Sequence, residues 1–162
     1  MTDLSLMQHN GVDIINWGQD LLMNRVHLVH GLIEGSPCLV PNMADGRYSH
    51  KGKKVAYCYQ IIAYCEFGPG NLKKVAAAKT NNDLTISHLC GTRNCCNGSH
   101  LILEPKWLND LRTHCHHILN TIFLKSGYEG LRKAITDGYC THNPKCCFCR
   151  VDHEDPFDSD DE

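Results

Sequence analysis

Five potential metal ligands lie within sixteen residues of the sequence, in the segment ISHLCGTRNCCNGSHL at positions 86–101. Three of them, Cys90, Cys95 and His100, form the pattern C-x4-C-x4-H on a short loop that contains glycine. Thiolate and imidazole groups at this spacing are typical of three corners of a tetrahedral zinc site. The fourth ligand must come from elsewhere in the chain, and we predict Cys38, an isolated cysteine in a turn-rich segment.

A second group of potential ligands lies further along the chain, where CTHNPKC places Cys140, His142 and Cys146 in the pattern C-x-H-x3-C. Cys115, on a predicted helix, completes this set. Neighbouring residues of the same chemical types are alternative ligands: His114, His116, Cys147 and Cys149. Two closed four-ligand sites predict two structural zinc ions, which would stabilise a loop-rich chain in place of part of its core.

His88 has no place in the first zinc site once that site has four ligands. It lies two residues before Cys90, at the end of a predicted strand, and Asn109 follows twenty-one residues later near the start of a predicted helix. An imidazole can accept a proton from water, and an amide oxygen suits a hard cation such as Mg²⁺. The two residues therefore predict a site with one general base and one metal ion; a purely structural histidine is the alternative.

Hydrophobic periodicity and turn residues indicate the elements that must position these groups. Residues 13–33 predict a helix, 105–125 a helix with proline in its first turn, and 81–90 a short strand that enters the metal loop. The apolar run at 55–67 fits a strand, a buried helix, or a strand that passes into a helix. A hairpin, a loop and a helix around zinc predict an α+β fold with little conventional core.

Chain length and charge distribution limit the class of protein. At 162 residues one domain is the default, and we place it at 1–151, followed by an acidic tail at 152–162. The tail holds seven of the eighteen acidic residues, which leaves sixteen basic against eleven acidic residues and a net charge of +5 elsewhere. A mildly basic body suits a nucleic-acid partner. We expect a disordered, solvated tail, with competition for a basic face as the alternative.

The eleven cysteines bear on the cellular compartment. The first twenty residues show neither a basic region nor an apolar run before a cleavage site, and no segment has the roughly 20 apolar residues that cross a bilayer. In a reducing compartment, cysteines interleaved with histidines are more often zinc ligands than disulfides, and an odd number cannot all pair. We therefore expect an intracellular protein without a membrane segment.

These residues resemble a known family. The segments SHLCGTRNCCNGSHL and WLND are similar to the His-Cys box of homing endonucleases, within the ββα-metal, or His-Me finger, nuclease superfamily. The resemblance covers most of residues 38–146, including both ligand sets. It implies a ββα-metal motif in a Mg²⁺-dependent endonuclease that cuts double-stranded DNA at specific sites, with His88 as general base, Asn109 as the magnesium ligand and two structural zinc ions. A homodimer is implied as well, and we expect a nuclear location.

The chain departs from the family pattern in three places. Twenty-four residues separate Cys115 from Cys140, more than in the family, so we expect a longer helix and a displaced second zinc loop. The arginine that family members place near the scissile phosphate has no clear counterpart, although Lys53 or Lys54 lies in the corresponding stretch. Family members exchange C-terminal tails between subunits, whereas this tail is a run of acids, so that mode of dimerisation is not carried over.

Basic and aromatic residues around the box are the predicted DNA contacts. Most come from the segment GRYSHKGKK and the strand after it, and the zinc loop supplies one more: Arg47, Lys51, Lys53, Lys54, Tyr57 and Arg93. A two-stranded ribbon fits the major groove, where Tyr59 would accompany Tyr57 on the strand. Lys106 and Arg112 are candidates for holding phosphates near the proposed site. A solvated basic turn without DNA contacts is the alternative for this cluster.

Two other classes of function compete with a site-specific nuclease. One is a non-catalytic, zinc-stabilised DNA-binding module, which would lack the catalytic pair. The presence of both His88 and Asn109 argues against that class. The other is a sequence-independent His-Me finger nuclease, and the double zinc pattern favours the site-specific type over it.

Overall fold

The computed structural model describes residues 4–30 and 37–146 of the chain. This part contains three α-helices and three two-stranded antiparallel sheets, which confirms the predicted α+β class. None of its helices combines the length and the apolar character needed to span a bilayer. In chain order the elements are η1 (Leu4–Gln8), α1 (Gly11–Asn24), β1 (Val26–Val29), β2 (Cys38–Pro41), β3 (Arg47–His50), β4 (Lys53–Tyr57), α2 (Cys58–Ala76), β5 (Leu84–His88), η2 (Gly98–His100), β6 (Leu101–Pro105) and α3 (Lys106–Thr136).

Helix α1 begins where Asn10 caps it, because the Asn10 side chain accepts a hydrogen bond from the Val12 N–H. Its buried face, which includes Ile14, Trp17 and Leu21, belongs to the main hydrophobic core. The helix ends at Asn24, so the predicted extension to residue 33 is wrong. Residues 26–29 instead form β1, which pairs with β2. This pairing outweighs the local helical pattern and brings Cys38 to the end of a ribbon.

The apolar run at 55–67 is a strand that passes into a helix, one of the three possibilities left open by the sequence. Strand β4 ends at Tyr57, whose backbone N–H donates to the Gln60 side chain in the first turn of α2. Tyr59 therefore lies on the helix and not on the strand face where we expected it. Cys58 is buried, as a small hydrophobe would be, whereas Cys65 is exposed.

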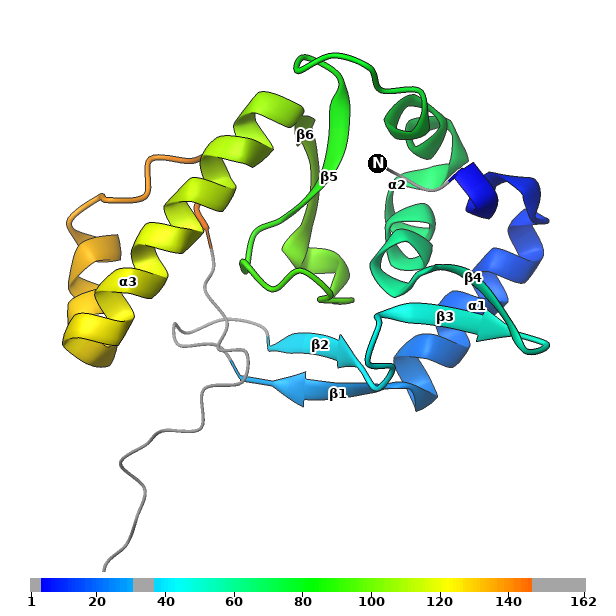
Figure 1. Ribbon diagram of the computed structural model, residues 1–162, viewed down its shortest axis with the longest axis horizontal. Helices are drawn as coiled ribbons and strands as arrows, with labels where there is room; N and C mark the ends of the chain where they lie inside the picture. The colour runs from blue at the N-terminus through cyan, green and yellow to red at the C-terminus, as the bar shows by residue number, and fades with distance from the viewer. Residues whose placement is uncertain (1–3, 31–36, 147–162) are drawn as a thin grey trace, which may run out of the picture.

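Strands β5 and β6 pair in antiparallel register, with His88 opposite Leu101. The hairpin lies between α2 and α3, both of which contact β5 (Figure 1). Helix α3 begins directly after Pro105 and breaks at Gly127, where φ is 62° and ψ is −161°, so its first segment ends close to the predicted residue 125. The second segment folds back along the first. The extra residues before Cys140 therefore form a returning segment and not one longer continuous helix.

The hydrophobic core is divided into one main cluster and two smaller ones. The main cluster joins α1, α2 and the β3–β4 ribbon, with Ile61 and Ile62 of α2 almost fully buried. Each smaller cluster is built on cysteines: one contains Cys38, Cys90 and Cys95, and the other contains Cys115, Leu119, Leu131, Cys140 and Cys146. The zinc-binding loop and the end of α3 therefore pack mainly around thiols.

Candidate metal centres and active site

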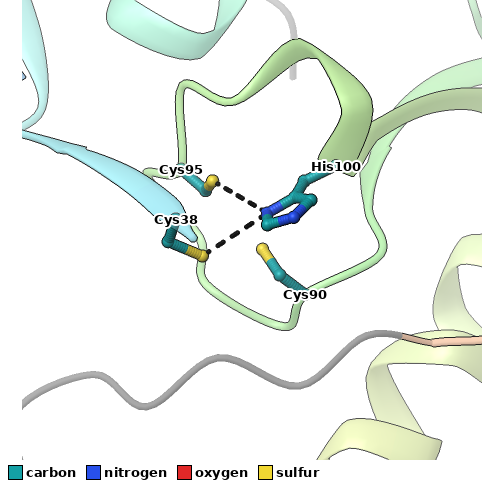
Figure 2. A group of neighbouring side chains, drawn as sticks. All are labelled: Cys38, Cys90, Cys95 and His100. Carbon is teal, nitrogen blue, oxygen red and sulfur yellow. Dashed lines mark hydrogen bonds between the residues drawn. The ribbon is translucent and has the colours of Figure 1, made fainter. Parts of the chain in front are cut away.

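The first predicted zinc set comes together in the structure. Figure 2 shows Cys38, at the start of β2, beside three residues of the loop between β5 and β6: Cys90, Cys95 and His100. Their four ligand atoms all lie within 4.8 Å of one another, and all four residues are buried. The Nδ1 atom of His100 lies 3.6 Å from the Cys38 Sγ and 3.5 Å from the Cys95 Sγ.

These distances fit a tetrahedral zinc ion. Zinc–sulfur and zinc–nitrogen bonds of about 2.3 and 2.0–2.1 Å place adjacent S and N ligands about 3.6 Å apart at the corners of a tetrahedron. With every ligand buried, the group has the closed character of a structural site and offers no open position for water.

Backbone contacts hold the first loop in shape. The Thr92 and Asn97 N–H groups donate to the Sγ atoms of Cys90 and Cys95, each at 3.4 Å. The loop is tied to the β1–β2 ribbon because the Asn97 side chain donates to the Pro37 carbonyl and the Cys96 N–H donates to the Leu39 carbonyl. A metal ion bound there would therefore fix both the ribbon and the end of β5.

The second predicted set also comes together. Cys115 on α3 joins Cys140, His142 and Cys146, again with ligand atoms within 4.8 Å of one another. The Nδ1 atom of His142 lies 3.6 Å from the Cys140 Sγ and 3.8 Å from the Cys146 Sγ. Three ligands are buried and His142 is half-buried, so this site lies nearer the surface than the first.

The alternative ligands for the second site fall into two groups. His114 is exposed and outside the cluster. His116 is hydrogen-bonded at Nε2 to the Leu89 carbonyl, 3.0 Å away, and burial lowers its pKa to about 4. Its ring packs against Gly91, so it braces the first zinc loop from α3. Cys147 and Cys149 lie outside the described residues.

His88 ends β5 directly before the first loop. The Tyr59 ring meets it edge to face, with centroids 5.0 Å apart and ring planes at 71°. Burial lowers the pKa of His88 to about 4, and the thiol and backbone of Cys95 partly oppose that shift. The Nε2 atom is buried and has no hydrogen bond of ordinary geometry within the described part of the chain. The ring is therefore neutral at pH 7, while its burial weakens the proton affinity on which a role as general base depends.

Asn109 lies one turn into α3, with its side chain against β5. Its Oδ1 accepts a hydrogen bond from the Ser87 hydroxyl at 3.0 Å, and its Nδ2 donates to the Thr85 hydroxyl at 3.1 Å. Ser87 is the neighbour of His88, so the two predicted catalytic residues are positioned by the same strand. A neutral amide oxygen is a donor that Mg²⁺ accepts in proteins, and the residue fits that role chemically.

A family model described as the zinc-binding loop region of homing endonuclease matches residues 38–156. The chain belongs to this family. The matched range begins at Cys38 and contains both cysteine–histidine clusters. No curated protein and no solved structure matches the chain. The resemblance inferred from the residues is thus confirmed at the level of the family.

In this member of the homing endonuclease zinc-loop family, the predicted DNA contacts lie on and beside the β3–β4 ribbon. Lys51, Lys53 and Lys54 are exposed, and Lys51 and Gly52 form the turn with φ values of 49° and 74°. Lys54 is paired with Asp45. The Arg47 guanidinium lies over the Tyr57 ring, 4.6 Å from its centroid.

Tyr59 connects that ribbon to His88 at the end of β5. Arg93 is exposed on the zinc loop. Burial and the neighbouring Tyr57 raise the pKa of Tyr59, and the positive charge of Arg93 acts in the opposite direction. Tyr59 also stacks on Tyr57, with centroids 5.8 Å apart. Tyr59 was predicted only as a groove residue, and its contact with His88 was not predicted.

The predicted phosphate role of Arg112 is wrong. None of the Arg112 side chain is exposed, and it pairs with Glu104, which is equally buried. Lys106 is exposed but bonded to Asp110, one turn along α3. The residues that hold Asn109 and Arg112 in place, namely Thr85, Ser87 and Glu104, were also missed. Their only signals in the sequence are the alternation of Thr85 and Ser87 with apolar residues in LTISH and the single glutamate in the apolar run LILEP.

Proposed function

We propose that the protein is a Mg²⁺-dependent, site-specific endonuclease for double-stranded DNA. The observation that carries the proposal is the attachment of Asn109 to the strand that ends in His88, through the Thr85 and Ser87 hydroxyls. A general base and an oxygen ligand for a hard cation thus come from one ββα unit, stabilised by a cysteine–histidine cluster in its loop. Family membership supports the same chemistry.

Each cysteine–histidine cluster would hold one structural zinc ion. The first, formed by Cys38, Cys90, Cys95 and His100, would fix the loop that follows His88. The second, formed by Cys115, Cys140, His142 and Cys146, would fasten the returning end of α3. Zinc ions with four protein ligands give folding free energy and leave no position for substrate.

Phosphodiester hydrolysis requires an activated water and neutralisation of charge on the phosphate. His88 would take the proton from that water, and its Tyr59 contact would keep the imidazole in one orientation. Asn109 would offer its Oδ1 as the protein ligand of the metal. When bound, Mg²⁺ would supply Lewis acidity for the phosphate and the leaving 3′ oxygen.

DNA would approach along the β3–β4 ribbon. From Arg47 a row of ring contacts continues through the stacked Tyr57 and Tyr59 to His88, which Tyr59 meets edge to face. The ribbon lysines would add phosphate contacts, and Arg93 would reach the backbone near the reacting phosphate from the zinc loop. An exposed ribbon of this kind suits the major groove, while cations at its turn position the protein without selecting sequence.

The working unit would be a homodimer, because one such site hydrolyses one strand of a duplex. Residues 1–151 would act as one domain, with the acidic residues 152–162 as a tail. We also propose that the protein acts inside the cell, in the nucleus. A reducing compartment keeps the eleven cysteines available as zinc ligands.

The test is cleavage of a randomised duplex library with Mg²⁺, followed by sequencing of the cut ends. A shared motif at both sides of the cuts would support a site-specific enzyme. Cuts without a motif would support the sequence-independent nuclease instead. If zinc-loaded protein binds the library but leaves every duplex intact with Mg²⁺ or Mn²⁺, the DNA-binding module becomes the better assignment.

A further inference from the structure

A fully buried ion pair lies between β6 and α3. The Arg112 guanidinium donates to both carboxylate oxygens of Glu104, from Nε at 3.0 Å and from Nη2 at 2.9 Å. The two side chains are 0% and 3% exposed. A buried ion pair loses hydration that its attraction only partly restores, and apolar residues of similar size often stabilise a fold as well. Stability alone is therefore a weak explanation for this pair.

On its other side, Arg112 contacts the second cysteine–histidine cluster. Its Nη1 donates to the Pro144 carbonyl at 2.9 Å and to the Cys146 Sγ at 3.4 Å. Cys146 belongs to the cluster that we assign to the second zinc ion. The guanidinium is thus held on two sides, by the β6 carboxylate and by the loop that carries the metal ligands.

The Glu104 carboxylate is also linked, through Ser87, to Asn109. Burial alone would raise the pKa of Glu104, but hydrogen bonds from Arg112 and from the Ser87 hydroxyl hold it below the usual range. The same Ser87 hydroxyl lies 3.0 Å from the Asn109 Oδ1, so its single proton is shared between the carboxylate and the amide oxygen. A continuous chain of contacts therefore runs from Cys146 through Arg112, Glu104 and Ser87 to Asn109.

We propose that Ser87, Glu104 and Arg112 are positioning residues that fix the orientation of the Asn109 carboxamide, with the second cysteine–histidine cluster as their anchor. This inference rests on the proposed function, in which Asn109 is a metal ligand. A free carboxamide can turn its oxygen or its nitrogen toward a cation, and only the oxygen binds. Because Ser87 and Thr85 hold the two ends of the amide, the network sets which end is offered.

The test is a double-mutant cycle in which the measured quantity is the chemical shift of the Asn109 side-chain amide. In zinc-loaded protein, the side-chain amide signals of Asn109 are followed by ¹⁵N NMR in Ser87→Ala, Glu104→Gln and the double variant. We expect each single change to shift these signals. We expect the double variant to match Ser87→Ala, because the effect of Glu104 passes through the Ser87 hydroxyl.

A second measurement connects the network to the metal. The Mg²⁺ concentration for half-maximal DNA cleavage should rise about 10-fold or more in Ser87→Ala, as is typical for residues that orient a metal ligand, with zinc content unchanged. Thr121→Ala is the matched control, because it removes an α3 hydroxyl that bonds only to the His117 carbonyl in its own helix. The control should leave both the Asn109 signals and the Mg²⁺ requirement at wild-type values.

The outcomes separate the two proposals. If wild-type protein does not cleave DNA, the proposed function fails, but the NMR cycle still decides whether the network reaches Asn109. If Ser87→Ala and Glu104→Gln lower thermal stability while the Asn109 signals stay in place, the residues are structural and the inference is overturned. Additive shifts in the double variant would overturn it as well, because they exclude transmission through Ser87.

Discussion

His88 takes its orientation from residues outside the pattern that first pointed to it. Its ring contacts Tyr59 at the start of α2, and its pKa is set chiefly by burial. Cys95, a predicted zinc ligand, also influences it. Residue spacing predicted the identity of the candidate base. Its aromatic neighbour Tyr59 lies 29 residues earlier and depends on how α2 packs against β5.

Replacement of His88 by alanine should reduce DNA cleavage by about 10²-fold or more, because a proton acceptor has been removed and little else. DNA binding and zinc content should stay at wild-type levels. His114→Ala is the matched control, since this α3 histidine is exposed and lies outside both clusters. Near wild-type cleavage by His88→Ala, with zinc unchanged, would show that His88 is a bystander.

The elements around the metal loops were the most predictable part of the fold. Cysteine and histidine spacing restricts how a loop can close, so β5, the zinc loop, β6 and the start of α3 follow closely from the sequence. The end of α1 did not, because residues 26–29 pair with β2, a partner that local periodicity cannot identify. The Arg112–Glu104 ion pair could not be predicted from the sequence either, since it depends on how α3 packs against β6.

Two zinc ions per chain should be found by metal analysis of wild-type protein purified without added zinc, one for each cysteine–histidine cluster.

The variant Cys140→Ser should leave about one equivalent and expose the end of α3 to proteolysis, because the second cluster loses a ligand. Cys95→Ser should instead release the first ion, loosen the loop after His88 and abolish cleavage. Cys65→Ser, at an exposed cysteine outside both clusters, should retain both ions. One equivalent or none in wild-type protein would contradict the two-site assignment.

Gly127 allows α3 to fold back on itself. Its φ of 62° and ψ of −161° lie in a region that side chains strongly disfavour, so Gly127→Ala should lower the free energy of unfolding by about 1–3 kcal/mol in urea titrations. Gly70→Ala is the control, because its added methyl group meets no atom within 4 Å and its φ is ordinary. That change should be neutral or mildly stabilising. Equal effects of the two changes would argue against a strained turn at Gly127.

At the scale of the whole molecule, the described residues form layers in the order α3, the β5–β6 hairpin, α2 and α1 (Figure 1). The candidate active site lies on the hairpin, between α2 and α3. Each cysteine–histidine cluster forms a small core of its own outside the main cluster. This arrangement supplies one His88 and one Asn109 per chain, and therefore one proposed hydrolytic unit per chain.

Under the proposed function, cleavage of both DNA strands would use two chains related by a twofold axis. Sedimentation at micromolar concentration should give a complex of two 18.2 kDa chains with one duplex that carries the selected site. The same protein should convert supercoiled plasmid to linear DNA with little accumulation of nicked circles. Mixed dimers of wild-type and His88→Ala chains should nick only one strand, because just one unit retains its base. A monomer on DNA that yields only nicked circles would contradict the dimer and leave single-strand cleavage as the activity of the chain.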